Sequence, residues 1–344
     1  METTTPRQTA LVTGAAGFIG LFVCQRLLAD GWRVIGFDAM TEYYDVALKR
    51  RRLGLLLQTP DFSFIEAQLE EPGRLAQLMA DEAPDLVVHL AAQAGVRYSI
   101  EAPRTYVETN LVGTFELLEA ARAHPPEHLL MASTSSVYGA NTEMPYSETM
   151  KVDTQMSFYA ATKKANEAMA HSYAHLHGMP ITMFRFFTVY GPWGRPDMAY
   201  FKFVRAIREG RSIDVYNHGD MMRDFTFVED LVEGIARLAV TPPAAPGDPS
   251  RAHPYEGDSL SPVAPWRVVN LGHGKPLQLG AFIAAIEEAL GTTAEKVFLP
   301  MQPGDVQATW ADARLLTSLV GPLPHTPLND GMRRFVEWYL AEYE

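Results

Sequence analysis

Up to Phe187, the chain alternates short apolar segments with stretches of helical periodicity. A strand written as a nearly continuous apolar run is typical of a parallel sheet that is covered by helices on both faces. Connections between such strands are right-handed, so the pattern predicts an α/β fold with a Rossmann-type doubly wound parallel sheet. The segments expected to form strands are 9–13, 33–38, 62–66, 85–92, 128–136, 181–187 and 266–272.

A glycine-rich turn, TGAAGFIG, follows the first of these segments. Gly14, Gly17 and Gly20 allow a sharp turn, a close backbone approach to a pyrophosphate, and tight packing of helix on strand, in that order. Phe18 and Ile19 begin the next helix, whose free N–H groups and positive dipole end attract phosphate. We therefore expect these five residues to bind a dinucleotide.

Asp38 ends the second expected strand, at the distance from Gly14 where dinucleotide-binding folds carry an acidic residue. Its carboxylate would accept hydrogen bonds from the adenosine ribose and repel a 2′-phosphate. The sequence therefore predicts NAD rather than NADP as the cofactor.

Tyr159 and Lys163 are four residues apart on an expected helix and therefore share one face. The ammonium and the positively charged nicotinamide would favour the phenolate and lower the pKa of the tyrosine. The preceding strand ends in the hydroxyl cluster 133–136, which could hold a substrate alcohol and share in proton transfer. These residues predict removal of a hydride and a proton from an alcohol.

The chain after Phe187 changes character at the glycine- and proline-rich segment GPWGRPD. We expect residues 1–187, 223–240 and 266–272 to form the NAD-binding domain. A smaller C-terminal α/β lobe would comprise 188–222 and 273–344 and bind the substrate. The proline- and glycine-rich segment 241–265 is expected to be an exposed loop. The expected helices are 19–30, 105–123, 157–177, 198–209, 278–290 and 329–343.

Composition narrows the range of partners. The net charge of −12 argues against nucleic acid and anionic membranes, which would repel the chain. Cys24 is the single cysteine, and the chain has neither an apolar leader nor an apolar stretch that could span a bilayer, which predicts a cytoplasmic protein. The ten histidines show no metal-ligand spacing, so we predict no metal.

The order of motifs resembles the extended short-chain dehydrogenase/reductase superfamily, and within it the NAD-dependent nucleotide-sugar epimerases, most closely those acting on UDP-glucuronate. The resemblance implies that Thr134 assists Tyr159, that Arg223 binds the diphosphate, and that Asp305 contacts the uridine ribose. Arg195 is a second candidate for the diphosphate, because a guanidinium matches phosphate oxygens. The motifs are TGAAGFIG, HLAAQAGVRYS, TNLVGT, STSSVYG, YAATK, RFFTVYGPWGRPDMA, RDFTFVED and MQPGDVQATWAD.

The implied reaction is 4-epimerisation of UDP-glucuronic acid to UDP-galacturonic acid through a transient 4-keto sugar. Ser135, Ser136 and Thr188 would hold the sugar carboxylate, so that the keto acid keeps its carbon dioxide. A UDP-glucose/UDP-galactose 4-epimerase and a UDP-glucuronate decarboxylase stay open as alternatives. A dehydratase would carry acids beside the catalytic hydroxyl, where this chain has Ser135 and Ser136, and a non-enzymatic dinucleotide sensor would typically lack Tyr159. Relatives also imply a homodimer through helices 105–123 and 157–177.

Overall fold

The computed structural model describes residues 7–249, 255–302 and 305–343. The strands are β1 (Thr9–Thr13), β2 (Arg33–Asp38), β3 (Phe62–Glu66), β4 (Leu86–His89), β5 (His128–Thr134), β6 (Ile181–Phe186), β7 (Thr188–Tyr190), β8 (Ile213–Tyr216), β9 (Met222–Phe227), β10 (Trp266–Leu271), β11 (Pro276–Gln278), β12 (Lys296–Leu299) and β13 (Ala308–Thr309). The α-helices are α1 (Phe18–Ala29), α2 (Val46–Leu56), α3 (Arg74–Glu82), α4 (Tyr98–Glu101), α5 (Pro103–Tyr106), α6 (Gly113–Ala123), α7 (Phe158–His177), α8 (Ala199–Arg208), α9 (Val228–Ala239), α10 (Leu279–Leu290), α11 (Arg314–Val320) and α12 (Leu328–Tyr343).

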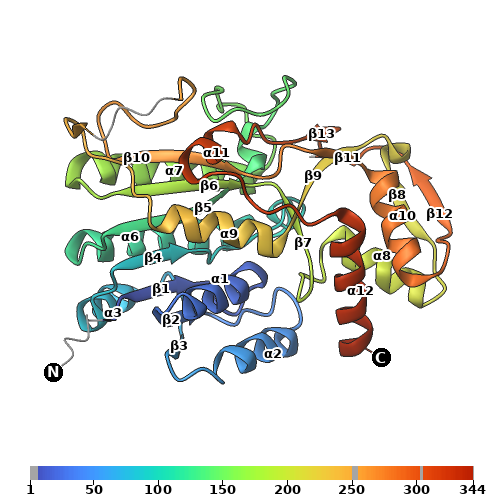
Figure 1. Ribbon diagram of the computed structural model, residues 1–344, viewed down its shortest axis with the longest axis horizontal. Coiled ribbons are helices and arrows are strands. Elements are labelled where there is room, and N and C mark those ends of the chain that lie inside the picture. The colour runs from blue at the N-terminus through green and yellow to red at the C-terminus, as the bar shows by residue number, and fades with distance from the viewer. Residues whose placement is uncertain (1–6, 250–254, 303–304, 344) are drawn as a thin grey trace.

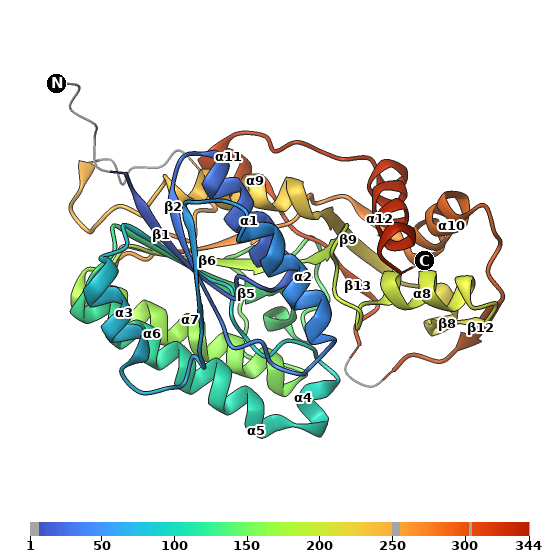
Figure 2. The same ribbon diagram turned by 90° about the horizontal axis from the view of Figure 1, so that it is seen from below.

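The larger part of the molecule is a seven-stranded sheet in the order β10-β6-β5-β4-β1-β2-β3, with every neighbouring pair parallel. Helices α3, α6 and α7 cover one face, and α1, α9 and α11 cover the other (Figures 1 and 2). Each face has its own apolar cluster because these strands are buried on both sides. The predicted Rossmann-type α/β fold is confirmed.

Two predicted elements end or bend where polar side chains offer the backbone other partners. Strand β5 stops at Thr134 rather than at 136, because the Thr134 hydroxyl accepts a hydrogen bond from Ser136 N (3.2 Å) and starts the 3₁₀ turn η2 (Ser135–Tyr138). The expected helix 105–123 contains a π-helical segment, η1 (Val107–Val112). There Asn110 turns inward, accepting from Gln93 N and donating to Thr162 Oγ1.

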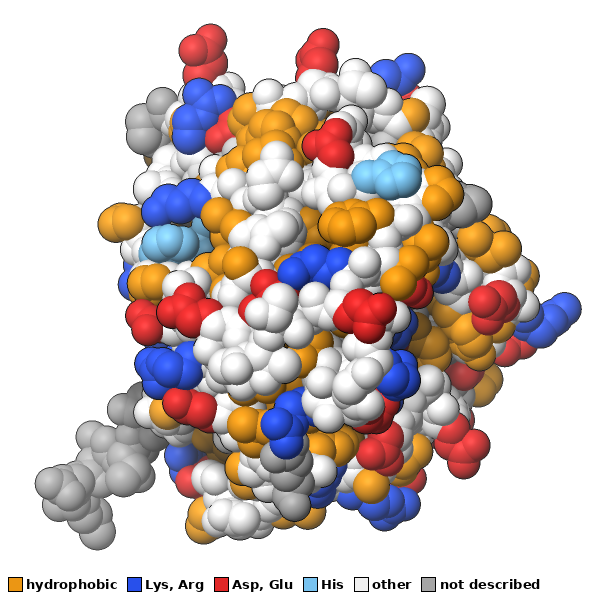
Figure 3. Space-filling model, turned by 90° about the vertical axis from the view of Figure 1, so that its right-hand side faces the viewer, with side chains coloured by type: hydrophobic (Ala, Val, Ile, Leu, Met, Phe, Trp, Pro, Cys, Tyr) orange, Lys and Arg blue, Asp and Glu red, His pale blue; other side chains and the backbone are white. Residues whose placement is uncertain are grey.

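The smaller lobe is built on two short sheets at one end of the molecule. Strand β9 pairs with β7, β11 and β13, and β8 pairs with β12. Helices α8, α10 and α12 pack together over an aromatic-rich core that includes Phe201, Phe282 and Phe335. On the face of this lobe in Figure 3, acidic and basic side chains are interspersed. No helix in the described part of the chain has the length and apolarity needed to cross a membrane.

The predicted division of the chain differs from the structure in two places. Strand β9 was assigned to the larger domain, but it forms the centre of the smaller lobe's four-stranded sheet. Helix α11 was assigned to the smaller lobe, yet Leu315 and Leu316 are buried in the larger core against α9 and β10. Both differences have one cause. The chain passes from one lobe to the other at β9 and again at α11, and the composition of the sequence does not mark these crossings.

The segment 241–265 is only partly an exposed loop. Residues 244–249 lie mostly at the surface, and 250–254 fall outside the described residues. Asp258 pairs with Arg267 of β10 (2.9 Å), and Ser261 bonds His171 of α7 (2.8 Å). Proline and glycine therefore mark an irregular backbone here, but side-chain hydrogen bonds fasten its second half to the edge of the sheet.

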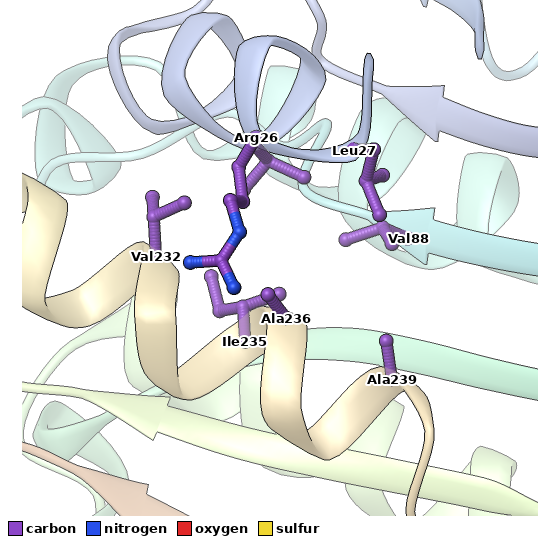
Figure 4. Close-up of a pocket in the computed structure, with 8 residues that line it drawn as sticks. Arg26, Leu27, Val88, Val232, Ile235, Ala236 and Ala239 are labelled. Carbon is purple, nitrogen blue, oxygen red and sulfur yellow. The ribbon is translucent and has the colours of Figure 1, made fainter. Parts of the chain in front are cut away.

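Helices α1 and α9 pack closely against each other. Figure 4 shows Arg26 of α1 reaching across toward α9, beside Val232 and Ile235, and its guanidinium pairs with Glu233. The shallow depression between these helices leaves no room for a water molecule, so it is a packed contact and not a ligand site.

Candidate active site

The glycine loop between β1 and α1 is shaped by contacts that exclude larger residues. Gly14 has φ +76°, and a Cβ there would lie 2.8 Å from Ala91 N. A Cβ on Gly20 would lie 2.0 Å from the carbonyl oxygen of Gly14. Gly17 is the N-cap of α1, makes no side-chain cap bond, and is followed by no acid in the first turn. The first N–H groups of α1 are therefore unopposed by any carboxylate of that turn, as an anion site requires.

Asp38 stands at the end of β2 beside this loop. Its carboxylate accepts hydrogen bonds from Ala16 N (3.1 Å) and Met40 N (2.8 Å), which fix its orientation. Burial raises its pKa, against the opposing effect of the backbone N–H groups and of Lys49. These two bonds hold the Asp38 carboxylate, a hydrogen-bond acceptor, at the position expected for the adenosine ribose.

Phe18 and Ile19 were predicted to bind the cofactor, and they begin α1 as expected. The Phe18 side chain is buried in the core and meets Phe22 edge-on, with 6.1 Å between ring centroids. It can therefore serve a cofactor only through its backbone N–H, whereas Ile19 is partly exposed.

Tyr159 and Thr134 come together at the carboxyl end of the large sheet. Tyr159 lies in the first turn of α7, which Ser157 caps by accepting from Ala160 N (3.1 Å). The Thr134 hydroxyl, which donates to Ser136 Oγ (3.2 Å), lies close enough to the phenol to affect its pKa. Burial raises the pKa of Tyr159, while the positive charge of Arg195 and the Thr134 hydroxyl lower it.

The Lys163 ammonium bonds the backbone of β5 in this structure. It is buried and donates to Ala132 O (2.9 Å), and burial lowers its pKa to about 8. The positive charge of Arg195, which is also a candidate for the diphosphate, lowers the pKa of the Tyr159 phenol. Arg195 in turn pairs with Asp197 (Nε to Oδ1, 3.0 Å). That Lys163 lowers the phenol pKa stays a prediction.

Three further hydroxyls surround the carboxyl ends of β5 and β6. Ser135 and Ser136 follow Thr134 directly and are partly exposed. Thr188 follows β6 by two residues, and Phe186 at the end of β6 pairs in register with Thr134. The polar ends of neighbouring parallel strands thus meet at the edge where such sheets bind ligands.

Arg223 and Asp305 approach from the smaller lobe. Arg223 donates to the carbonyl oxygens of Val306 (2.7 Å) and Gln307 (3.0 Å), and burial lowers its pKa. Asp305 pairs with Arg97 (3.2 Å). Arg223 thus has uncharged hydrogen-bond partners in the described structure, whereas the Asp305 carboxylate is already engaged.

A buried network beneath the site was missed from the sequence. Glu167 of α7 accepts from Ser133 (2.7 Å) and from Arg185 of β6 (2.9 Å), and it locks the catalytic helix onto β5 and β6. Glu167 lies four residues after Lys163, so the helical spacing that joined Tyr159 to Lys163 could have found it.

The structure also gathers Asp230, His273 and His325, whose potential ligand atoms lie within 4.8 Å of one another. Their distance along the chain hides this group from a search for ligand spacing. The Asp230 carboxylate already accepts from Thr326 N (2.7 Å) and Thr326 Oγ1 (2.9 Å), besides His273. These bonds explain the cluster as a junction between the lobes.

Comparison with known proteins identifies the family. Residues 10–248 match the NAD dependent epimerase/dehydratase family. The chain belongs to this family. A probable UDP-glucuronate 4-epimerase of Rhizobium meliloti (strain 1021) is 52% identical over 334 residues, 97% of each chain. UDP-glucuronate 4-epimerase 4 of Arabidopsis thaliana is 42% identical over 97% of this chain and 76% of its own. The crystal structure of UDP-glucuronic acid 4-epimerase from Bacillus cereus with UDP-glucuronic acid and NAD superposes with a TM-score of 0.85, at 31% identity over 98% of this chain and all of that one.

NAD is the cofactor of this epimerase/dehydratase family member, as predicted. The residues present fit it: a tight turn in which a Cβ at Gly14 or Gly20 would collide with the backbone, the unopposed start of α1, and the oriented Asp38 carboxylate. The α1 N-terminus would hold the pyrophosphate and Asp38 the adenosine ribose.

Proposed function

We propose that this protein catalyses the NAD-dependent 4-epimerisation of UDP-glucuronic acid to UDP-galacturonic acid. The observation that carries the proposal is the place of the Tyr159 phenol near the Thr134 hydroxyl, at the carboxyl end of β5, where Thr134 lowers the phenol pKa. A relative named as a probable UDP-glucuronate 4-epimerase, 52% identical over 97% of the chain, supports this choice of sugar.

The chain's residues would divide the reaction as follows. Tyr159 removes the proton from the sugar 4-hydroxyl, Thr134 orients that hydroxyl, and the charge of Arg195 stabilises the phenolate. NAD, when bound, supplies the hydride acceptor and donor for sugar carbon 4. Arg223 would hold the diphosphate while the 4-keto sugar turns and presents its other face. Tyr159 then returns the proton, and the configuration at carbon 4 is inverted.

Epimerisation and decarboxylation differ in what happens to the sugar carboxylate. A 4-keto uronate loses carbon dioxide when its carboxylate bond aligns with the carbonyl π system. We propose that the hydroxyls of Ser135, Ser136 and Thr188 keep that bond out of alignment. The absence of an acid at positions 134–136 also disfavours dehydration.

Incubation of the purified protein with UDP-glucuronate, followed by separation of the products, tests the proposal. Formation of UDP-galacturonate is expected, while UDP-pentose would identify a decarboxylase. UDP-glucose serves as the parallel substrate, and faster conversion of it would favour the alternative epimerase. The Thr188→Val variant is expected to lower the ratio of epimer to pentose, and an unchanged ratio would remove Thr188 from this role.

We also infer that two copies associate through α6 and α7, which pack side by side (Figure 2). Large apolar side chains stay exposed on these helices and the adjoining segments, including Phe115 (45%), Phe158 (41%) and Leu176 (67%). Analytical ultracentrifugation is expected to give a dimer and the Phe115→Lys variant a monomer, and a monomeric wild type would refute the inference. The cytoplasmic location stays a prediction, to be tested by cell fractionation.

A further inference from the structure

Arg52 of α2 is a fully buried cation that joins three separate segments. Its side chain is 0% exposed. Nη1 donates to Ala16 O in the glycine loop (3.2 Å) and to the Tyr44 hydroxyl (2.7 Å). Nε donates to Trp193 O (3.0 Å), and Nη2 donates to Gly194 O (3.1 Å). We call Arg52 and these four acceptors the Arg52 clasp.

The place of the clasp in the fold gives it a direct relation to the cofactor. Ala16 lies between Gly14 and Gly17, and its N–H orients Asp38. Tyr44 belongs to the loop 39–45 between β2 and α2, whereas Trp193 and Gly194 lie in the segment that leads into the smaller lobe. One guanidinium therefore fastens both neighbouring segments to the loop that the pyrophosphate contacts.

The charge of Arg52 lacks a directly bonded anion among the described residues, because its acceptors are three carbonyls and a phenol. A buried charge is costly unless it is compensated. The charge of Arg52 lowers the pKa of Asp38 although the two side chains are not bonded. The charge therefore acts on the carboxylate expected at the cofactor ribose. A diphosphate at the start of α1 would bring two negative charges into the same region.

A second tether runs parallel to the clasp. The Tyr43 hydroxyl donates to Asp197 (3.2 Å), which pairs with Arg195. Loop 39–45 is thus bonded both to the buried Arg52 and to the segment 191–197. These bonds would resist any separation of the two segments from the glycine loop.

We propose that the Arg52 clasp retains NAD, because the cofactor leaves only when loop 39–45 or the segment 191–197 moves away from the glycine loop. An epimerase needs the same NAD molecule for both halves of its reaction, so slow release keeps the intermediate from being stranded. The inference requires NAD as the cofactor but is independent of the sugar that the enzyme accepts.

Exchange of bound NAD for isotopically labelled NAD, measured without any sugar, tests the clasp. The Arg52→Lys variant keeps the charge but loses the forked geometry, and we expect it to exchange NAD about tenfold faster. Tyr44→Phe removes a single acceptor, and about threefold faster exchange is expected. Circular dichroism and thermal unfolding of each NAD-free variant separate a loss of fold from a loss of retention.

Arg51 offers a matched control one residue away. It joins α2 to α12 through Glu342 (2.9 Å) and lies over the Tyr343 ring, so Arg51→Lys weakens a contact between elements that does not involve the glycine loop. Its exchange rate should stay within about twofold of the wild type. Wild-type exchange in a folded Arg52→Lys variant overturns the proposal. If that variant does not fold, wild-type exchange in Tyr44→Phe overturns it. A failed sugar assay with unchanged NAD retention would count against the proposed epimerisation alone.

Discussion

The cofactor end and the sugar end of the site are built differently. At the cofactor end, residues between positions 14 and 38 supply the loop, the helix start and the acid, and backbone N–H groups orient the acid. The sugar end gathers Thr188, Arg195, Arg223 and Asp305 from segments spread over more than a hundred positions. Its charged side chains already have protein partners. The cofactor end is therefore set by local geometry. At the sugar end, the charged side chains must give up contacts with the protein before they can bind a ligand.

Tyr159→Phe gives the largest expected effect, because it removes the proton acceptor and leaves both ends intact. Turnover of UDP-glucuronate should fall by about a thousandfold, with NAD content and substrate affinity near those of the wild type. Steady-state kinetics and isothermal calorimetry measure the two quantities. Substantial turnover by this variant would refute the assigned role of the phenol.

Gly20→Ala tests the rigidity of the cofactor end. The new Cβ would lie 2.0 Å from Gly14 O, so the loop or α1 must shift. We expect NAD affinity to fall by about a hundredfold or more, since the helix start no longer points at the pyrophosphate. Gly31→Ala, where no atom lies within 4 Å of the added Cβ, controls for loss of a glycine, although its φ of +92° adds local strain. Fluorescence titration with NAD measures both variants, and equal affinities would show that the loop adapts.

The sequence predicted the cofactor end better than the sugar end, and locality is the reason. A strand, three glycines and an acid lie close together in the chain, and contacts within this stretch, such as Ala16 N to Asp38, help to set their roles. The effect of Arg195 on the Tyr159 phenol depends on how two separate segments meet, which periodicity does not contain. Arg52 was missed for the same reason, because its four acceptors come from three other parts of the chain.

Arg223→Met tests the sugar end directly. The wild-type guanidinium bonds only backbone carbonyls within the described structure, so its charge is available to a diphosphate. We expect the KM for the UDP-sugar to rise by about tenfold, with a smaller change in kcat. Retention of NAD should be unchanged, which separates this effect from damage to the cofactor end. An unchanged KM would show that Arg223 does not bind the diphosphate.

Arg195→Met should move the pH profile rather than abolish activity. The positive charge of Arg195 lowers the pKa of Tyr159, and its loss also leaves Asp197 without its ion-pair partner. The acidic limb of kcat/KM should shift upward by about one pH unit. A profile that stays in place would show that Arg195 does not act on the phenol.

Glu148→Gln should leave turnover least affected and act on stability. Burial raises the pKa of Glu148 from 4.5 to about 7, so only the folded chain holds this proton between those values. Its stabilising contribution is complete below pH 4.5 and is lost as the pH rises to about 7, by at most about 1.4 kcal/mol per unit. Urea unfolding at several pH values should show the wild type losing stability relative to the variant across this window. If the stabilities of the wild type and the variant changed with pH in parallel, the raised pKa of Glu148 would be contradicted.

The π-helical segment Val107–Val112 gives the helix a built-in phase shift. Each wide turn carries one residue more than an α-turn, so the following helix α6 is rotated relative to α5. Removing that residue would turn α6 by roughly 100° about its axis. Phe115 would then leave the surface it now occupies, and Asn110 would lose its inward bonds. The number of residues in this segment therefore sets both which side of α6 faces outward and whether Asn110 can make its inward bonds. A change in that number would alter both together.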